Sequence, residues 1–435
     1  MRLLRLLKND LAQETAEWVK DDIISESQAE VICQRYGADY HQRNNRSLGY
    51  NVLVALGYLF IGLSVITLLG ANWEQIPRGV RMSGLIALTM CTQLVAVKKY
   101  TSGKTSAATG IFLLGNLFYG ASIILIAQIY HLGEHMPDGV FWWALGCLLI
   151  AVTTRSPWIM LQTLLLALIW FFTEVDLGFY PIAFPLFLVG SLWVLMRGSS
   201  SLLLFFLTVV SFVFYAEYSL AKFWSVDRYY FFGHENAVVS ISFFILMYAF
   251  SHWLHQRNSV AAKDYASLLS VWSLRFGLLL MLVLSFEWPW EELIKTYWDH
   301  KQSMLLLVAF FLTAALGLAV LTQKIQMVLV AVIGFLIPLF AVITIDDPSL
   351  ATYLQVMSNL ALIIWGGWLI LKGIQLGISH YFFLGLCAIL ITALIRYIAL
   401  IGDYIGGAVL FLAFAGLLLG AAKYWKKTQF KEAKA

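Results

Sequence analysis

The stretch that decides the fold is ATGIFLLGNLFYGASIILIAQIY, residues 108–130, which contains no charged side chain. At 1.5 Å of rise per residue, a helix of this length crosses a hydrocarbon core of about 30 Å. Similar uncharged blocks recur along the chain, separated by short segments that carry charges, Pro or Gly. The stretch therefore predicts one of many membrane-spanning helices.

The composition of the whole chain supports this interpretation. Of 435 residues, 60% are hydrophobic and 12% are charged, whereas soluble domains have roughly 45–50% and 25%. The ten-residue alternation of a membrane β-barrel is absent from the sequence. A net charge of +4, from scattered basic residues, does not favour a nucleic-acid partner. The predicted fold is all-α, a polytopic transmembrane helix bundle.

The apolar blocks predict about fourteen membrane helices behind a charged N-terminal segment. They lie at residues 50–70, 79–98, 108–130, 139–154, 156–173, 178–197, 199–217, 236–255, 267–287, 303–322, 325–344, 351–371, 376–397 and 404–424. The predicted organisation is a cytoplasmic helical segment at 1–48, a transmembrane helical domain at 49–425 and a cytoplasmic basic tail at 426–435.

The basic residues predict the orientation of these helices. With the N-terminus inside, most of the 29 Lys and Arg residues fall in the N-terminal segment, the inward connectors and the C-terminal tail. This asymmetry follows the positive-inside rule, so both termini are expected in the cytoplasm. The residues left over allow only short loops, without a folded extracytoplasmic domain.

Two short helices are expected in the N-terminal segment. Apolar residues recur there at helical spacing, and Asp21-Asp22 marks a break. Ser25 and Gln28 have the spacing of a capping box at the start of the second helix, and Gly37 is expected to end it. The mixed charge and apolar stripe of this segment permit binding to a cytoplasmic protein partner.

Polar side chains inside the apolar blocks are candidates for a substrate-binding site, because a polar group in hydrocarbon is costly and tends to face the protein interior or water. They are Asn116, Gln128, Gln162, Arg275, Asn359, His380 and Arg396. From this set we predict a substrate-binding role for Arg275, Asn359, Gln128 and Asn116. The alternative for each amide is a hydrogen bond that only joins two helices.

Arg275 is the strongest of these candidates. It lies about eight residues into its predicted helix, too far to reach the inner interface easily. We expect it to face a cavity lined by protein, with Asn359, Gln162 or Glu287 as a partner. The alternative is an arginine that snorkels to the inner interface.

Arg78 and Arg81 form a second candidate binding site. They are three residues apart and follow Pro77, so a helix starting there presents both on one face. With Asn72 they can hold a lipid phosphate or an anionic substrate through charge-assisted hydrogen bonds. The alternative is that both anchor the helix to ordinary headgroups.

A metal motif is also present, in residues 131–135. His131, Glu134 and His135 spell H-x-x-E-H, but Gly133 and Pro137 interrupt the helix that such a zinc motif needs. We interpret the motif as a polar loop, and no metal, cofactor or catalytic residue is predicted. The four cysteines show neither disulfide nor metal spacing.

Several stretches resemble a family of bacterial multi-spanning predicted membrane proteins of unknown function. They are LAQETAEWVKDDIISESQAEVICQRYG (11–37), GANWEQIPRGVRM (70–82), ILIAQIYHLGEHMPDGVFWWAL (124–145), TTRSP (153–157) and, near the end, IRYIALIGDYIGGAVLFLAFAGLLL (395–419). The resemblance implies a bacterial inner-membrane protein and carries no established activity.

Three functions remain open at this point. The many spans, short loops and prolines within helices favour a transporter or translocase of a small or lipid-linked substrate. An enzyme acting on a lipid-linked substrate is the second, with Arg78 and Arg81 holding phosphate and Glu74 or Glu287 as base. The third is a scaffold or regulator that binds a partner through residues 1–48. No nucleotide-binding motif is present.

Overall fold

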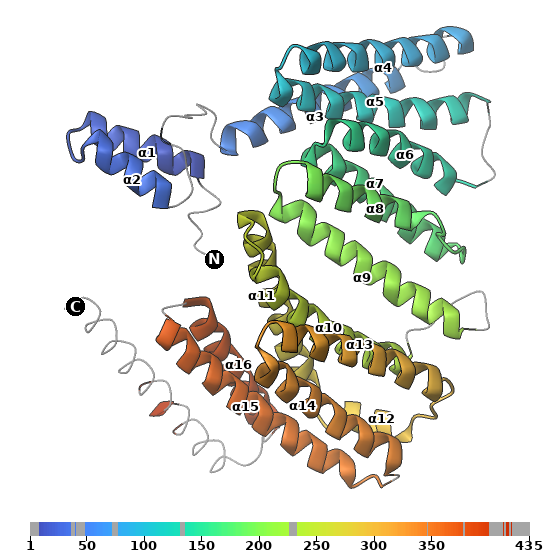
Figure 1. The fold of residues 1–435 in the computed structure, drawn as a ribbon. Helices are drawn as coiled ribbons and strands as arrows, with labels where there is room; N and C mark the ends of the chain where they lie inside the picture. Colours follow the sequence, from blue (N-terminus) through green and yellow to red (C-terminus); the bar gives the residue numbers. More distant parts are fainter. Residues whose placement is uncertain are drawn as a thin grey trace. The chain divides into compact units, whose positions relative to one another are not determined.

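The computed structural model describes residues 8–35, 40, 48–71, 77–130, 135–225, 233–345, 347–376 and 379–399, with residues 412, 415, 416 and 419. Within these residues every regular element is a helix, which confirms the all-α prediction (Figure 1). The chain divides into two compact units. The first unit is Met1–Ser219 with Val226–Tyr229, and the second is Leu220–Ser225 with Tyr230–Ala435.

The first unit is built from nine helices in the described residues. They are α1 (Lys8–Lys20), α2 (Glu26–Arg35), α3 (Leu48–Ala71), α4 (Arg78–Thr101), α5 (Thr105–Tyr130), α6 (Pro137–Thr154), α7 (Pro157–Asp176), α8 (Phe184–Arg197) and α9 (Leu202–Trp224), whose last turn lies in the second unit. The second unit contains α10 (His234–His255), α11 (Val260–Val283), α12 (Trp288–Lys295), α13 (Lys301–Leu321), α14 (Ile325–Thr344), α15 (Leu350–Leu376) and α16 (Ser379–Ala399).

The two short helices predicted in the N-terminal segment are present as α1 and α2, and they pack against each other. The Ser25 backbone N–H donates to Gln28 Oε1 at 2.9 Å, and the Gln28 N–H donates to Ser25 Oγ at 3.3 Å. This reciprocal pair is a capping box, and it confirms the predicted start of the second helix. At the break before it, Asp22 has a φ of 53°. The predicted role of Gly37 falls outside the described residues.

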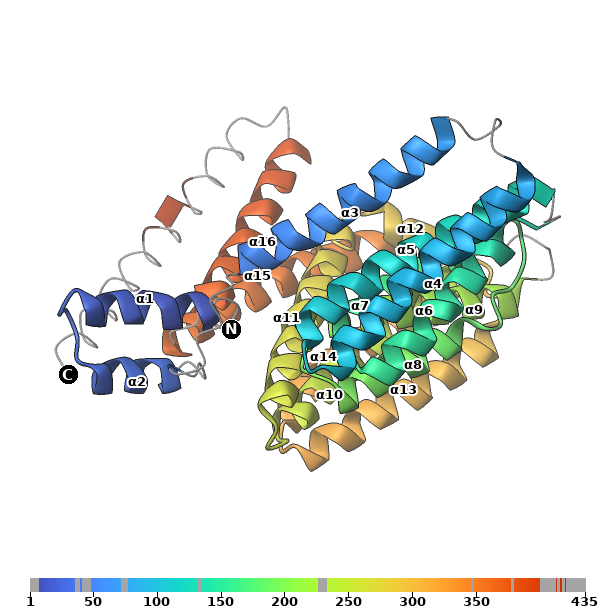
Figure 2. The ribbon, with the colours of Figure 1, turned by 90° about the horizontal axis from the view of Figure 1, so that it is seen from above.

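Helix α7 is the central helix of the first unit. In the most apolar 18-residue stretch of α7, 61% of the residues are buried. The corresponding share is 11–33% in the nine other long apolar helices found in the described parts of the chain. It contacts α5, α6 and α8, and Figure 2 shows α4 to α7 running side by side. Packing is close here: a Cβ on Gly120 of α5 would collide with the indole of Trp143 on α6.

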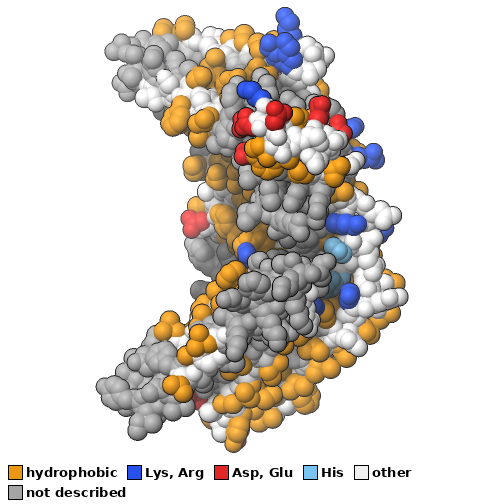
Figure 3. All heavy atoms as spheres, turned by 90° about the vertical axis from the view of Figure 1, so that its left-hand side faces the viewer, with side chains coloured by type: hydrophobic (Ala, Val, Ile, Leu, Met, Phe, Trp, Pro, Cys, Tyr) orange, Lys and Arg blue, Asp and Glu red, His pale blue; other side chains and the backbone are white. Residues whose placement is uncertain are grey.

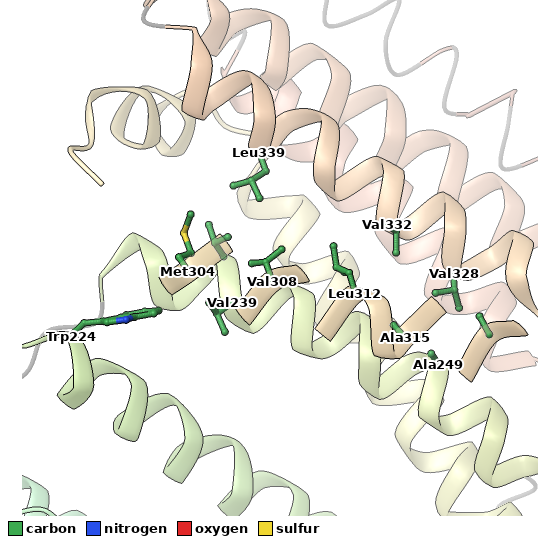
Figure 4. Close-up of a cluster of buried hydrophobic side chains, with 12 residues drawn as sticks. Trp224, Val239, Ala249, Met304, Val308, Leu312, Ala315, Val328, Val332 and Leu339 are labelled. Carbon is green, nitrogen blue, oxygen red and sulfur yellow. The ribbon is translucent and has the colours of Figure 1, made fainter. Parts of the chain in front are cut away.

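The core of the second unit is apolar. Side chains of α10, α13 and α14 meet in it, and Trp224 from the last turn of α9 joins them (Figure 4). Small and branched residues such as Ala249, Ala315 and Val328 form most of the contact. Close packing of this kind stabilises helix association where lipid is as apolar as the side chains.

The surface of the described residues is also unusually apolar. Large hydrophobic side chains are exposed on most of the long helices. On the face drawn in Figure 3 they cover wide areas, and charged side chains are confined to a few places. Contiguous exposed apolar surface of this extent suits contact with lipid rather than water.

The predicted count of fourteen spans is not confirmed. The described residues contain ten helices long and apolar enough to cross a membrane, with shorter apolar helices at Phe184–Arg197 and Tyr381–Ile395. The predicted helix at 404–424 lies almost wholly outside the described residues.

Several helix boundaries differ from the prediction, and those of α8 and α11 have a clear local reason. Helix α8 begins at Phe184 rather than at 178, because Gly178 ends α7 with a φ of 78° and Pro181 follows in the turn. Helix α11 spans Val260–Val283 rather than 267–287, since Lys263 and Asp264 are accommodated in its first two turns.

The connector 288–302 contains a helix, α12, that the sequence analysis missed. Its Trp290 is buried and donates its indole N–H to the Leu284 carbonyl at 2.7 Å. Before α15, Asp347 accepts a hydrogen bond from the Ser349 backbone N–H at 2.9 Å, which lowers the pKa of the Asp347 carboxyl.

Candidate functional site: polar groups along helix α7

The most deeply placed polar groups of the first unit lie on or against α7. Gln162 lies in the second turn of this helix and Glu174 lies in its last turn. Twelve residues separate them, which corresponds to about 18 Å along the axis. The central helix therefore carries a polar group near each end of its apolar length.

An amide network surrounds Gln162. The Asn116 side chain on α5 is fully buried, and its Nδ2 donates to Gln162 Oε1 at 2.9 Å. Gln93 Nε2 on α4 donates to Asn116 Oδ1 at 3.1 Å, and Gln162 Nε2 donates to the Leu113 carbonyl at 3.3 Å. The Trp143 indole N–H on α6 donates to the Asn116 carbonyl at 2.7 Å. The network thus joins α4, α5, α6 and α7.

One acceptor in this network is left over. Gln93 Oε1 is buried and has no hydrogen-bond partner among the described residues. A buried carbonyl without a donor costs roughly 1–3 kcal/mol. The hydrogen-bonding capacity of this oxygen is therefore unused among the described residues.

At the other end of α7, Glu174 forms a buried pair with a histidine. Only 9% of the Glu174 side chain is exposed, against 28% for His135. His135 Nε2 lies 3.1 Å from both carboxylate oxygens. The indole N–H of Trp170, one turn earlier on α7, donates to Glu174 Oε1 at 3.0 Å. The carboxylate is thus held by two side chains in a place that is nearly closed to solvent.

The end of α7 explains the position of this pair. The Phe179 N–H donates to the Glu174 carbonyl at 2.9 Å, and the Gly178 N–H donates to the Val175 carbonyl at 3.0 Å. With Gly178 at positive φ, these bonds form a Schellman motif. The motif turns the chain back so that the Phe179 ring meets the His135 ring edge-on, with centroids 4.8 Å apart.

A third potential metal ligand lies beside the pair. One ligand atom each from His135, Asp138 and Glu174 lies within 4.8 Å of the others. Asp138 is exposed and occupies the first turn of α6, where the helix dipole favours a negative charge. The three side chains offer one nitrogen and two carboxylates around a common point.

Hydroxyl groups continue the polar surface past this cluster. The Tyr180 hydroxyl lies 3.0 Å from the Tyr215 hydroxyl and 2.9 Å from Ser219 Oγ. Both partners belong to the second half of α9, and all three residues lie in the first unit. The segment that follows α7 is therefore polar as well as aromatic.

The structure brings together only part of the predicted substrate-binding set. Asn116 and Gln162 are bonded to each other, as both interpretations of the amides allow, whereas Gln128 is exposed near the end of α5. Arg78 and Arg81 lie three residues apart at the start of α4, as predicted, with Arg78 exposed and Arg81 partly buried.

Arg275 and Asn359 lie in the second unit. Because α11 begins at Val260, Arg275 is fifteen residues into its helix rather than eight. It is exposed, and its guanidinium carbon lies 5.2 Å from the centre of the Trp272 ring.

The partners expected for Arg275 bond to other groups. Asn359 Nδ2 donates to the Ser285 carbonyl at 3.1 Å. Glu287 accepts a hydrogen bond from the Thr352 hydroxyl at 2.6 Å.

The sequence analysis missed Glu174 and Trp170 and gave no role to Asp138. It also interpreted His135 within the local H-x-x-E-H pattern, whose His131 and Glu134 lie outside the described residues. A usable signal was present, since of the two carboxylates at the end of this apolar block, Glu174 is the one four residues after a Trp and so lies on the same helix face as that Trp.

The helices, the apolar surface and the buried polar groups define a multi-spanning, all-helical membrane protein. Residues 16–160, a third of the chain, match the family described as Predicted membrane protein (DUF2157), which confirms the resemblance seen in the sequence. No curated protein and no solved structure matches the chain.

Proposed function

We propose that the chain is a bacterial inner-membrane transporter or translocase that carries a small or lipid-linked substrate past the polar face of α7. The observation that carries this proposal is the amide network on α7, with the acceptor Gln93 Oε1 left over inside an apolar bundle. Polar groups at this depth are costly and mark substrate pathways in membrane proteins. The Glu174–His135 pair stands at one end of the same helix.

Transport accounts for these features better than the other two functions. A network that only joins helices needs no spare acceptor, whereas a polar substrate or water passing Gln93 provides the missing donor. An enzyme would need a nucleophile and base within hydrogen-bond reach. Of the carboxylates considered as base, Glu287 accepts a hydrogen bond from Thr352, and Glu74 lies outside the described residues.

Water access to Gln162 tests the proposal. In full-length protein with its four cysteines replaced, Gln162→Cys is treated with a membrane-impermeant thiosulfonate reagent, in cells and in inverted membrane vesicles. A transport path makes the new thiol reactive from at least one side. The matched control is Leu165→Cys, less than one turn away and exposed on the outside of the bundle. A Gln162→Cys thiol that stays unmodified from both sides overturns the proposal.

The proposed orientation places both termini in the cytoplasm. It is supported by the distribution of the basic residues along the sequence. Reporter fusions at Ala435 and near Gly233 are expected to report opposite sides of the membrane, and the same side for both contradicts this orientation.

We also propose that the helix pair α1–α2 is a binding surface for a cytoplasmic protein. Two large apolar side chains, Ile23 and Val31, are exposed on it although the pair has its own small core around Ala29 and Cys33. Crosslinking from cysteines placed at Ile23 and Val31 tests this role, with cysteine at the exposed Glu30 of α2 as the control.

A further inference from the structure

We propose that His135, Asp138 and Glu174 bind a divalent transition-metal ion of the zinc type. The ligand atoms come from two places far apart in the sequence, the start of α6 and the end of α7. None of the comparisons assigns a metal to this chain, and the local H-x-x-E-H pattern requires a different ligand set. The metal site does not depend on transport.

The distances fit such an ion. A tetrahedral zinc ion with bonds of about 2.0–2.2 Å holds its ligand atoms roughly 3.3–3.6 Å apart. His135 Nε2 lies 3.1 Å from the Glu174 oxygens, and one Asp138 oxygen lies within 4.8 Å of both residues' ligand atoms. Asp138 is exposed, so its side chain can change rotamer to approach the other two ligands.

The surroundings of the carboxylate fit as well. Metal-binding carboxylates are oriented by hydrogen bonds from residues behind them. Trp170 Nε1 donates to Glu174 Oε1 at 3.0 Å, which leaves Oε2 for the ion. The Phe179 ring covers one side of His135, with centroids 4.8 Å apart. The carboxylate is therefore held in place before an ion arrives.

Charge favours a divalent cation at this point. With a neutral imidazole, the two carboxylates carry a charge of −2, and one divalent ion neutralises it in a place where burial makes uncompensated charge costly. The imidazole nitrogen favours a transition metal over Ca²⁺ or Mg²⁺, which prefer oxygen ligands. Three protein ligands leave a fourth position open towards the exposed Asp138 side.

Metal titration of the whole protein tests the site. Full-length protein without a polyhistidine tag is purified in detergent, stripped with a chelator and titrated with Zn²⁺ by calorimetry. Co²⁺ is then added as a spectroscopic probe of the ligand geometry. We expect one ion per chain and visible absorption typical of tetrahedral Co²⁺ with nitrogen and oxygen ligands. Stripped protein that binds neither ion overturns the proposal.

Variants assign the ligands. Asp138→Asn changes an exposed side chain, keeps the fold and is expected to lower Zn²⁺ affinity at least tenfold, and Glu174→Gln is expected to lower it further. Trp170→Phe removes the supporting hydrogen bond, together with part of a buried ring that packs against Phe141 and Phe187, and is expected to lower Zn²⁺ affinity roughly 10-fold or more. His234→Ala, which alters a two-residue His–Glu pair in the second unit, serves as the control. The assignment is contradicted if Asp138→Asn binds Zn²⁺ as tightly as the wild type does while His234→Ala binds it more weakly.

Discussion

The two units use polar residues in different ways. In the first unit polar side chains bond to one another inside the bundle: amide to amide around Asn116 and carboxylate to imidazole at Glu174. In the second unit the core around α10, α13 and α14 is apolar, and two cations lie closer to tryptophan rings than Arg197 lies to Trp193 in the first unit, at 5.3 Å. Arg257 lies 4.0 Å from the Trp253 ring centre and Lys372 lies 4.1 Å from that of Trp368.

This difference separates an interior role from an anchoring role. Buried, mutually bonded polar groups fix side chains in one geometry and cost stability if one partner is lost. A cation over an aromatic ring keeps its charge near water or headgroups and serves as an anchor at the membrane interface. Functional chemistry is therefore expected in the first unit, and the same type of substitution should cost more there than in the second.

The largest contrast is expected between two histidines. His135→Ala removes the partner of a carboxylate whose side chain is only 9% exposed, and is expected to destabilise the protein by about 3 kcal/mol. His234→Ala breaks a 3.8 Å contact to Glu292 between side chains 41% and 67% exposed, and is expected to cost about 0–1 kcal/mol. Unfolding in detergent with a chelator present measures both, and equal losses would remove the distinction between the units.

Helix packing gives the second contrast. Gly120→Ala places a methyl group against the Trp143 indole and is expected to destabilise the protein by about 1–3 kcal/mol. Gly317→Ala, on α13 of the second unit, meets no atom within 4 Å and is expected to stabilise its helix by up to about 1 kcal/mol. Melting temperatures that shift in the same direction would contradict the tight α5–α6 contact.

The class of fold and most helices could be predicted because uncharged blocks of membrane length are a local signal. The capping box at Ser25 and Gln28 is local too, and it was predicted correctly. The start of α8 was missed because Gly178 and Pro181 lie within an apolar run that hides the end of α7. Helix α12 was missed because eight residues with three charges resemble a loop.

The candidate site could be predicted only in part. Asn116 and Gln162 stand out as amides within apolar blocks, but nothing in the sequence shows that they bond to each other across 46 positions. Glu174 lay one residue beyond the predicted end of its helix and was taken as part of a connector. Pairing between helices depends on tertiary packing, which apolar periodicity does not encode.

The third contrast concerns two asparagines. Asn116→Ala leaves the Gln93 donor and the Gln162 acceptor without their partner, and is expected to cost about 1–3 kcal/mol. Asn359→Ala in the second unit removes a side chain whose Nδ2 donates to the Ser285 and Gln355 carbonyls, and is expected to cost about 0.5–1.5 kcal/mol. Thermal unfolding of both variants measures their losses of stability. A larger loss of stability for Asn359→Ala would place the more important polar contact in the second unit.

The smallest effect is expected from the cations of the second unit. Arg257 is exposed just after the end of α10, and its guanidinium lies over the Trp253 ring. Exposed cation–π contacts contribute roughly 0.5–1 kcal/mol, so Arg257→Leu is expected to change the melting temperature little. Trp253→Leu is the matched variant, because it removes the ring and leaves the charge. If the stack only anchors the helix end, the double variant loses no more stability than the sum of the losses in the two single variants. A loss above about 2 kcal/mol for Arg257→Leu alone would show that this cation supports the fold, and the division between an interior role in the first unit and an anchoring role in the second would then fail.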